Sequence, residues 1–245
     1  SGGGGRRKRR ERGGDIEKSI SISFKEAVAG VKKEIQYEKD EPCHQCDGTG
    51  AASRNGVKTC SQCGGRGQVT TTQRGFMGII QQVTTCPQCH GEGEIIKKKC
   101  RVCRGRKVIS ATQQTKISIP AGVESGMHLK VSGHGHVPSR DAIPGDLYVQ
   151  INVEDHPYFK RDGNDIIAEV DVDFITAITG GIISVRTLEG EREIKINPGT
   201  QSETYIRRKG EGFPSLNSMF DSVGDLYYKI NVRIPQYGKL SRKQR

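Results

Sequence analysis

CHQCDGTG, residues 43–50, is the first of four similar stretches that together hold all eight cysteines of this 245-residue chain. The others are CSQCGGRG (60–67), CPQCHGEG (86–93) and CRVCRGRK (100–107). Each stretch begins with a Cys-x-x-Cys pair, whose spacing lets both sulfurs reach one metal ion at about 2.3 Å. Two such pairs complete a tetrahedron. The sequence therefore predicts two Zn²⁺ ions per chain, each held by four thiolates.

The segment between the second and third pairs predicts which cysteines share a metal. QVTTTQRGFMGIIQQVTT (68–85) has β-branched residues on either side of a glycine-bounded turn, which indicates a β-hairpin. A hairpin brings its ends together, so the two pairs next to it should form an inner zinc centre and the two outer pairs a second. The inner centre is predicted to consist of Cys60, Cys63, Cys86 and Cys89. The outer centre is predicted to consist of Cys43, Cys46, Cys100 and Cys103.

Other interpretations of the cysteines are weaker. A disulfide framework fits poorly, because nothing marks the chain as secreted and Cys-x-x-Cys rings are tight. A thiol–disulfide oxidoreductase remains an alternative, since such pairs serve redox enzymes, but those use one pair beside a βαβ unit. His44 and His90 lie inside the repeats and are not expected as ligands. The first glycine of each repeat should adopt a positive φ that turns backbone N–H groups toward the sulfurs.

Outside the cysteines the chain repeats itself. FKEAVAG (24–30) matches FITAITG (174–180) at an offset of 150, whereas ISIPAGVES (117–125) matches IKINPGTQS (194–202) at an offset of 77. The change of offset means that the first copy carries about 73 additional residues, in the region where the cysteines lie. The zinc ribbon is therefore predicted to be an insertion into the first of two homologous domains.

Each copy has the pattern of a small β-domain. Apolar and polar residues alternate in EKSISISF (17–24), EVDVDF (169–174), LYVQINV (147–153) and LYYKINV (226–232), as in half-buried strands. The Phe-x-x-Ala segments suit short helical turns. The predicted fold class is mainly β: two tandem homologous β-sandwich domains, with an extended two-zinc β-hairpin ribbon inserted in the first and a hinge near residues 156–163.

Composition limits the classes of function. The formal charge is +11, but RRKRRER (6–12) supplies +5 of it, and two tetrathiolate zinc sites would subtract 4. A nucleic-acid binder using RRKRRER and Lys97–Lys99 is a second alternative. The repeats lack a recognition helix and stacking aromatics, so nucleic acid is not an expected partner. No apolar run approaches the ~18 residues of a membrane span, and a membrane is not expected either.

These features together resemble the zinc-containing, type A branch of the DnaJ co-chaperones. Four Cys-x-x-Cys-x-Gly-x-Gly repeats are the specific signature of that branch, although Lys107 replaces the last glycine here. Further similarity lies in IPAG (119–122), GDLYV (145–149), FKRDG (159–163) and RRKGEGFP (207–214). The resemblance covers residues ~15–245. The family's N-terminal J-domain, with its His-Pro-Asp motif, is not found in the sequence, so no stimulation of a partner's ATPase is expected.

The resemblance implies a co-chaperone core, not an enzyme. Such a protein binds unfolded polypeptide in an apolar groove of the first β-domain, prevents aggregation and delivers its client to a DnaK-type ATP-dependent chaperone. The inner zinc site would serve cooperation with that chaperone and the outer one client holding. By resemblance, the positions of client contact are Ile16, Ile35, Tyr37, Ile117 and Val149. Each of these residues can equally be part of the core.

The resemblance also implies boundaries, assembly and location. Residues 1–14 are expected to be the remnant of a flexible Gly/Arg-rich linker, and 15–155 the client-binding domain I with its zinc insertion at about 40–107. Domain II is predicted at 156–236, and the start of a dimerisation segment at 237–245. Homodimerisation is expected for a full-length protein, and it would be weaker in this chain. A bacterial cytoplasm is the expected location, and an organelle matrix is compatible.

Overall fold

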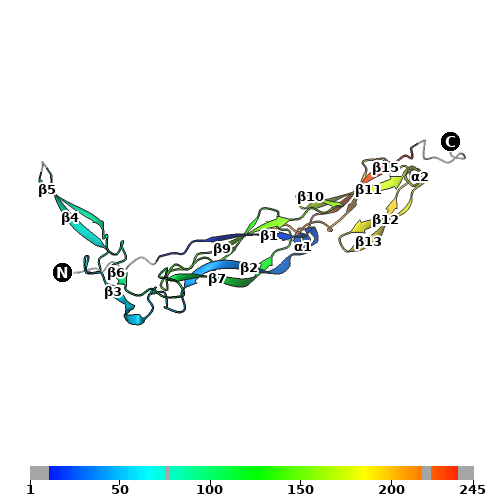
Figure 1. Cartoon of the computed structure of the whole chain (residues 1–245). Coiled ribbons are helices and arrows are strands. Elements are labelled where there is room, and N and C mark those ends of the chain that lie inside the picture. The colour runs from blue at the N-terminus through cyan, green and yellow to red at the C-terminus, as the bar shows by residue number, and fades with distance from the viewer. Residues whose placement is uncertain (1–10, 76–77, 217–221, 237–245) are drawn as a thin grey trace. The chain divides into compact units, whose positions relative to one another are not determined.

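The computed structural model describes residues 11–75, 78–216 and 222–236, and strands dominate it (Figure 1). The chain forms two compact units. The first is drawn from residues 1–18, 35–115 and 130–148, and the second from residues 19–34, 116–129 and 149–245. Most of the predicted linker, the hairpin turn at 76–77 and the predicted dimerisation segment at 237–245 lie outside the described residues. The predicted domain boundaries stay a prediction.

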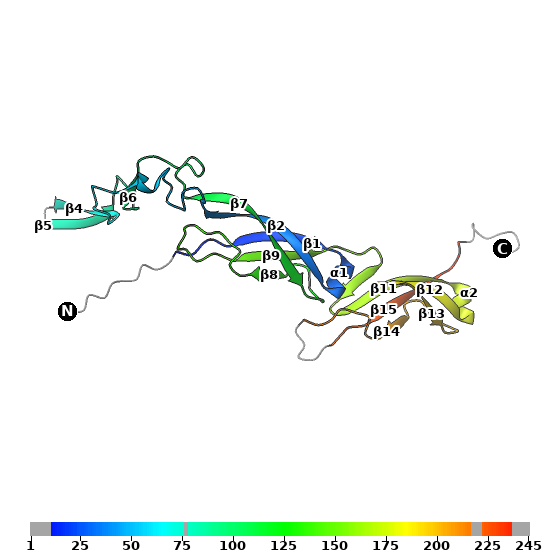
Figure 2. The same ribbon diagram turned by 90° about the horizontal axis from the view of Figure 1, so that it is seen from below.

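The first copy of the repeat contains two small sheets. One has three strands in the order β1-β9-β8, and the other has the two strands β2-β7. Their bounds are β1 (Ile16–Ile22), β2 (Val31–Pro42), β7 (Val108–Ile119), β8 (His128–Val131) and β9 (Leu147–Val153). β2 leads into the zinc insertion and β7 leads out of it, side by side in both ribbon views (Figures 1 and 2).

The zinc insertion is a series of short antiparallel ribbons. The strand β3 (Val57–Thr59) follows the 3₁₀ turn η1 (Arg54–Gly56) and pairs with β6 (Glu94–Ile96). Between them, β4 (Gln68–Gly75) and β5 (Gly78–Thr85) pair in register from Gln68 opposite Thr85 to Gly75 opposite Gly78. The predicted hairpin is therefore confirmed, and its register brings the second and third cysteine pairs together.

The second copy repeats the same plan without an insertion. A four-stranded sheet has the order β10-β11-β15-β14, and β12 pairs with β13. The bounds are β10 (Phe159–Asp162), β11 (Asp165–Asp173), β12 (Gly181–Thr187), β13 (Gly190–Ile196), β14 (Tyr205–Arg208) and β15 (Leu226–Arg233). β11 and β15 run parallel, with Ile166 opposite Leu226. Parallel neighbours need a crossover connection, which α2, β12, β13 and β14 supply.

The two short helices confirm the helical turns expected at the Phe-x-x-Ala segments. α1 (Phe24–Ala29) begins after Ser23, which forms a capping box with Glu26, and α2 (Phe174–Thr179) begins after Asp173, whose carboxylate accepts from the Thr176 N–H. Both end at glycines with positive φ, 73° at Gly30 and 75° at Gly180. The two strands predicted to run to Phe24 and Phe174 end earlier because these caps intervene.

The duplication extends to individual hydrogen bonds. In the first copy the Val153 N–H donates to Ser125 Oγ at 3.1 Å, and in the second the Val232 N–H donates to Ser202 Oγ at 3.1 Å. The same donor and acceptor types recur at the offsets found in the sequence. The predicted fold class, two homologous β-domains with an inserted zinc ribbon, is therefore confirmed. No helix of the described residues is long and apolar enough to cross a membrane.

Candidate metal centres

The eight cysteines converge in the two groups that the hairpin argument predicted. Within each group the four sulfurs lie within 4.8 Å of one another. The outer group contains Cys43, Cys46, Cys100 and Cys103, and the inner group contains Cys60, Cys63, Cys86 and Cys89. All eight side chains are buried, and none is in a disulfide.

Sulfur separations identify the kind of ligand that fits. Across the inner centre the Sγ–Sγ distances are 3.8 Å for Cys60–Cys86 and 3.7 Å for Cys63–Cys89. In the outer centre the corresponding separations are 4.0 and 3.7 Å. A regular tetrahedron with metal–sulfur bonds of ~2.3 Å has an edge of ~3.8 Å, whereas a disulfide needs ~2.05 Å. Both groups thus have the geometry of a tetrathiolate zinc site.

Left-handed backbone wraps each cysteine pair around its site. The residue after the second cysteine has φ between 52° and 58° in all four repeats, at Asp47, Gly64, His90 and Arg104. The next residue is a glycine with φ between 76° and 96°, at Gly48, Gly65, Gly91 and Gly105. The positive φ predicted for the first glycine of each repeat is therefore confirmed.

The second glycine of the repeat contributes a contact that the sequence analysis missed. The N–H groups of Gly50, Gly67 and Gly93 donate to the sulfurs of Cys46, Cys63 and Cys89 at 3.2–3.3 Å. Such N–H···S bonds stabilise a thiolate. The recurrence of a glycine four residues after the second cysteine of a pair was the available signal. Lys107, which replaces it in the fourth repeat, also has a positive φ of 71°.

The thiols of each centre differ in how readily they ionise. Burial raises the pKa of Cys46 and of Cys89 to about 11. A hydrogen bond from the Cys103 backbone lowers the pKa of Cys100 to about 7. Burial acts to raise the pKa of Cys63, but hydrogen bonds led by the Gly67 N–H outweigh it and lower that pKa to about 7. Each centre therefore contains one thiol with a lowered pKa and one with a raised pKa. Zinc would ionise its thiol ligands as it binds.

Almost no apolar side chain supports either centre. The outer cluster of cysteines has Ile109 packed against it, and the inner cluster has Val69 and Ile95. The four sulfur ligands complete a tetrahedral shell, which leaves no open position for a substrate or an activated water. The arrangement is therefore that of a structural metal site.

The five residues predicted to contact client occupy mostly buried positions. Ile16, in β1, is half-buried. The other four are 0–6% exposed: Ile35, Tyr37, Ile117 and Val149. The Tyr37 hydroxyl lies 2.8 Å from His134 Nδ1, so its polar end is satisfied within the fold. These four positions belong to the hydrophobic core, and contact with a client stays a prediction.

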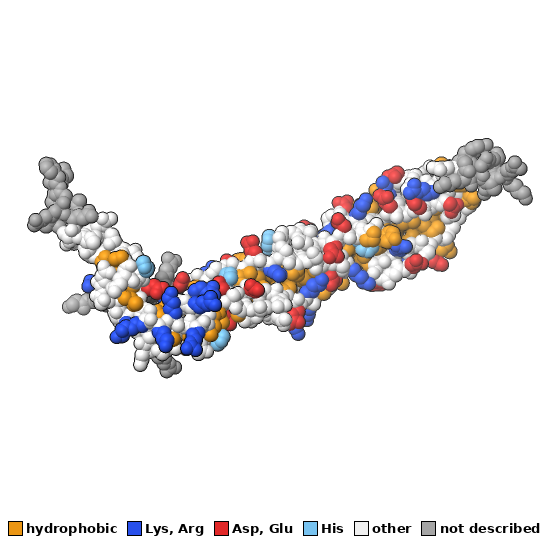
Figure 3. Space-filling model, in the orientation of Figure 1, with side chains coloured by type: hydrophobic (Ala, Val, Ile, Leu, Met, Phe, Trp, Pro, Cys, Tyr) orange, Lys and Arg blue, Asp and Glu red, His pale blue; other side chains and the backbone are white. Residues whose placement is uncertain are grey.

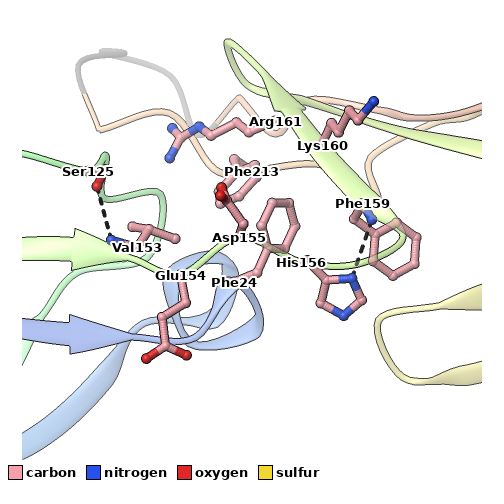
Figure 4. A pocket seen from close by; sticks show the side chains of 10 residues that line it. All are labelled: Phe24, Ser125, Val153, Glu154, Asp155, His156, Phe159, Lys160, Arg161 and Phe213. Carbon is pink, nitrogen blue, oxygen red and sulfur yellow. Dashed lines mark hydrogen bonds between the residues drawn. The ribbon is translucent and has the colours of Figure 1, made fainter.

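A cavity of about 560 Å³ lies beside the predicted hinge at 156–163. Figure 4 shows Phe24 and Phe213 in its wall, with Arg161 above Phe213. The guanidinium lies 4.0 Å from the Phe213 ring centre and donates to the carbonyls of Gly122 and Val123 at 2.9 and 2.6 Å. Arg161 thereby attaches residues 156–163 to the loop after β7, which indicates a structural role for this cavity wall.

The chain is similar in sequence to a protein family and to known proteins. The family described as DnaJ C terminal domain matches residues 16–235. A chaperone protein DnaJ of Clostridium beijerinckii is 42% identical over 239 residues, 96% of this chain and 63% of the relative. The DnaJ of Methanothermobacter thermautotrophicus is 39% identical over 243 residues, 99% of this chain and 64% of the relative.

A third relative, the chaperone protein DnaJ of Gloeothece citriformis, is 43% identical over 224 residues, 91% of this chain and 60% of the relative. The chain thus spans less than two thirds of the length of these relatives. Its family match covers both β-domains and the zinc insertion. With two four-cysteine clusters able to hold zinc, the chain belongs to the DnaJ C-terminal domain family.

Proposed function

We propose that this chain is a co-chaperone core that holds non-native polypeptide in its first β-domain, prevents its aggregation and delivers it to a DnaK-type chaperone. The observation that carries the proposal is the match of residues 16–235 to the DnaJ family, together with relatives that are named chaperone protein DnaJ. Neither zinc centre has an open coordination position, so metal-dependent catalysis is not part of the proposal.

Exposed strand edges support the holding of an extended client. β1 is an outer strand of its three-stranded sheet, and β2 and β7 form a two-stranded sheet of their own. An unpaired strand edge offers backbone N–H and C=O groups to an added strand, while pockets take alternate side chains. In this proposal the client contacts are the half-buried Ile16 and, at buried positions, Ile35, Tyr37, Ile117 and Val149.

Delivery, assembly and location are proposed from the resemblance to type A DnaJ co-chaperones rather than from any contact in the structure. The inner zinc centre would serve cooperation with the DnaK-type chaperone, and the outer centre would serve client holding. A homodimer is proposed for a full-length protein of this kind, through the dimerisation segment predicted to start at 237–245. A bacterial cytoplasm suits this role.

An aggregation assay tests the holding function. At a near-equimolar ratio the zinc-loaded chain should slow the aggregation of a chemically denatured protein. Ile16→Ser should weaken this protection, because it removes an accessible apolar contact. Val83→Ser is the matched control, since Val83 is 61% exposed in the hairpin and should not affect it. No slowing of aggregation by a chain with both zinc ions bound would reject the proposal.

The buried positions need a second readout. Ile35→Ser and Tyr37→Ser should weaken client-peptide binding while both zinc ions stay bound. Circular dichroism and thermal unfolding of the same samples show whether the domain remains folded. If each variant loses its fold along with peptide binding, these residues act only as core, and their proposed contact with the client is wrong.

A further inference from the structure

Many positively charged side chains surround the outer zinc centre, more than are needed to neutralise a tetrathiolate zinc site. Residues 97–107 contain Lys97, Lys98, Lys99, Arg101, Arg104, Arg106 and Lys107, seven cations with no acidic residue among them. The first six of these side chains are exposed. Lys107 Nζ pairs with Glu92 at 3.1 Å. The segment therefore presents a basic surface, named here the outer basic surface.

The inner centre shows that a tetrathiolate site needs no such surface. Both centres have four cysteine ligands and would carry the same charge of −2 with zinc bound. In the inner repeats, 60–67 and 86–93, one cation and one acidic residue leave no net charge. The outer repeats, 43–50 and 100–107, have four cations and one acidic residue, a net charge of +3, and residues 97–99 add three more cations. The outer basic surface therefore far exceeds what neutralisation of a zinc–thiolate site requires, which points to an acidic ligand.

The outer basic surface also contains a hollow and an exposed apolar side chain, Val102. A hollow of about 450 Å³ is lined by Gln45, Ala52, Lys98, Cys100, Arg101 and Val102. Val102 is 46% exposed among these cations. In Figure 3, Lys and Arg side chains gather near β3 and the start of β7. Cations arranged around an exposed aliphatic side chain suit a ligand that carries both carboxylates and apolar groups.

We propose that the outer basic surface binds an acidic, extended polypeptide segment of a partner protein. Lys and Arg side chains pair with Glu and Asp carboxylates, and the hollow beside Val102 accepts an apolar side chain of the same segment. A nucleic acid is the less favoured ligand, because residues 43–60 and 94–107 contain no Phe, Tyr or Trp on which bases could stack. The proposal does not depend on the client-holding function.

A fluorescence anisotropy titration tests the proposal with the full, zinc-loaded chain. The probe is a labelled 20-residue peptide of Glu and Ser with two Leu residues, and a second peptide has Gln in place of every Glu. The acidic peptide should bind at low ionic strength and weaken as salt rises, and the Gln peptide should not bind. No binding of the acidic peptide at low ionic strength overturns the proposal.

Paired variants locate the binding. Lys98→Gln with Arg101→Gln should weaken the acidic peptide about three- to tenfold, since two exposed ion pairs are lost. Lys97→Gln with Lys99→Gln, a second pair of exposed cations on the same surface, should weaken binding of the acidic peptide by a similar factor. This pair keeps the test decisive if the first pair of substitutions disturbs the metal site. The matched control, Lys195→Gln with Lys209→Gln, removes two exposed cations of the second β-domain and should change nothing. Equal binding by all variants overturns the proposal.

Two further measurements distinguish the alternatives. A 20-base-pair duplex that binds more tightly than the acidic peptide, and is weakened by the same variants, would show a nucleic-acid surface and reject a polypeptide ligand. The Lys98/Arg101 variant keeps all four cysteines of the outer centre, so it should retain both zinc ions and still slow aggregation in the assay described above. A loss of the peptide site with intact aggregation protection would confirm that the two functions are separate.

Discussion

At the scale of single residues, each β-domain has a largely buried aspartate whose carboxylate accepts a hydrogen bond from a glycine N–H. Asp146 Oδ1 accepts from the Gly133 N–H at 2.9 Å, and Asp225 Oδ1 accepts from the Gly210 N–H at 2.8 Å. Both carboxylates are largely buried, each in a Gly-Asp-Leu-Tyr stretch. The sequence showed that these stretches repeat. It could not predict the hydrogen bonds, because the glycine donors lie 13 and 15 residues before the aspartates.

These carboxylates predict an acid-sensitive fold. The Lys130 side chain, followed by the Gly133 N–H, lowers the pKa of Asp146, and the Gly210 N–H lowers that of Asp225. A lowered pKa stabilises the fold above the unfolded value of ~3.9, and this contribution is lost as pH falls through the folded pKa. The melting temperature should therefore fall as pH drops below about 4.

Asp225→Asn tests this origin of the acid sensitivity. The variant should be less stable than the parent at pH 7, and its melting temperature should depend less steeply on pH in the acid range. Asp162→Asn, at an exposed position of the same domain, should leave both properties unchanged. An unaltered pH dependence in Asp225→Asn would show that its carboxylate does not contribute.

A second prediction at this scale concerns Gly67, where the structure leaves no room for a side chain. A Cβ there would lie 2.3 Å from the Gly91 carbonyl oxygen, at a φ of 71°. Gly67→Ala should therefore lower the zinc affinity of the inner centre about 10- to 100-fold in a chelator competition. Gly64→Ala is the control, because nothing lies within 4 Å of its Cβ and Asp47 and His90 occupy the equivalent positions with φ of 52°. Equal zinc affinities would contradict the steric argument.

At the scale of elements, equivalent helices of the two copies have different surroundings. Phe24 of α1 is 6% exposed and packs edge-on against Phe213, with ring centres 5.1 Å apart. Phe174, at the same place in α2, is 37% exposed. The repeated Phe-x-x-Ala pattern predicted both helices correctly. It could not predict this difference, because the partner of Phe24 lies almost 190 residues away in the sequence.

This difference predicts unequal effects of the same substitution. Phe24→Ala removes a buried ring from an aromatic cluster and should lower the free energy of unfolding by about 3 kcal/mol. Phe174→Ala removes a partly exposed ring and should cost less than about 1.5 kcal/mol. Urea denaturation followed by tyrosine fluorescence measures both. Equal losses would mean that burial at α1 contributes little to the stability of the second unit.

Strand patterns had a related limit. Ile35 and Tyr37 lie two residues apart in β2 and therefore share one of its faces. Alternation along a strand cannot tell a core face from a binding face. The structure buries both side chains. The predicted β-hairpin was more informative for the zinc ribbon. A hairpin brings its two ends together, and this determines which cysteine pairs share a metal.

At the scale of the molecule, the β-domains and the zinc ribbon are stabilised in different ways. The β-domains bury aliphatic and aromatic side chains, whereas the zinc ribbon buries little besides its cysteines. Metal binding energy therefore replaces a hydrophobic core in the insertion. Removal of zinc by a strong chelator should unfold residues 43–107 while β10–β15 of the second domain stay protected in hydrogen exchange. Simultaneous loss of protection in both regions would contradict this division.

Native mass spectrometry of the intact chain tests the central claim most directly, by counting zinc ions per molecule. The parent should retain two tightly held zinc ions with all eight thiols protected from mild alkylation. Cys63→Ser should lower the zinc content to one and expose the remaining inner thiols, while the outer four stay protected. Fewer than two ions in the parent, with thiols that are free or joined in disulfides, would contradict the account.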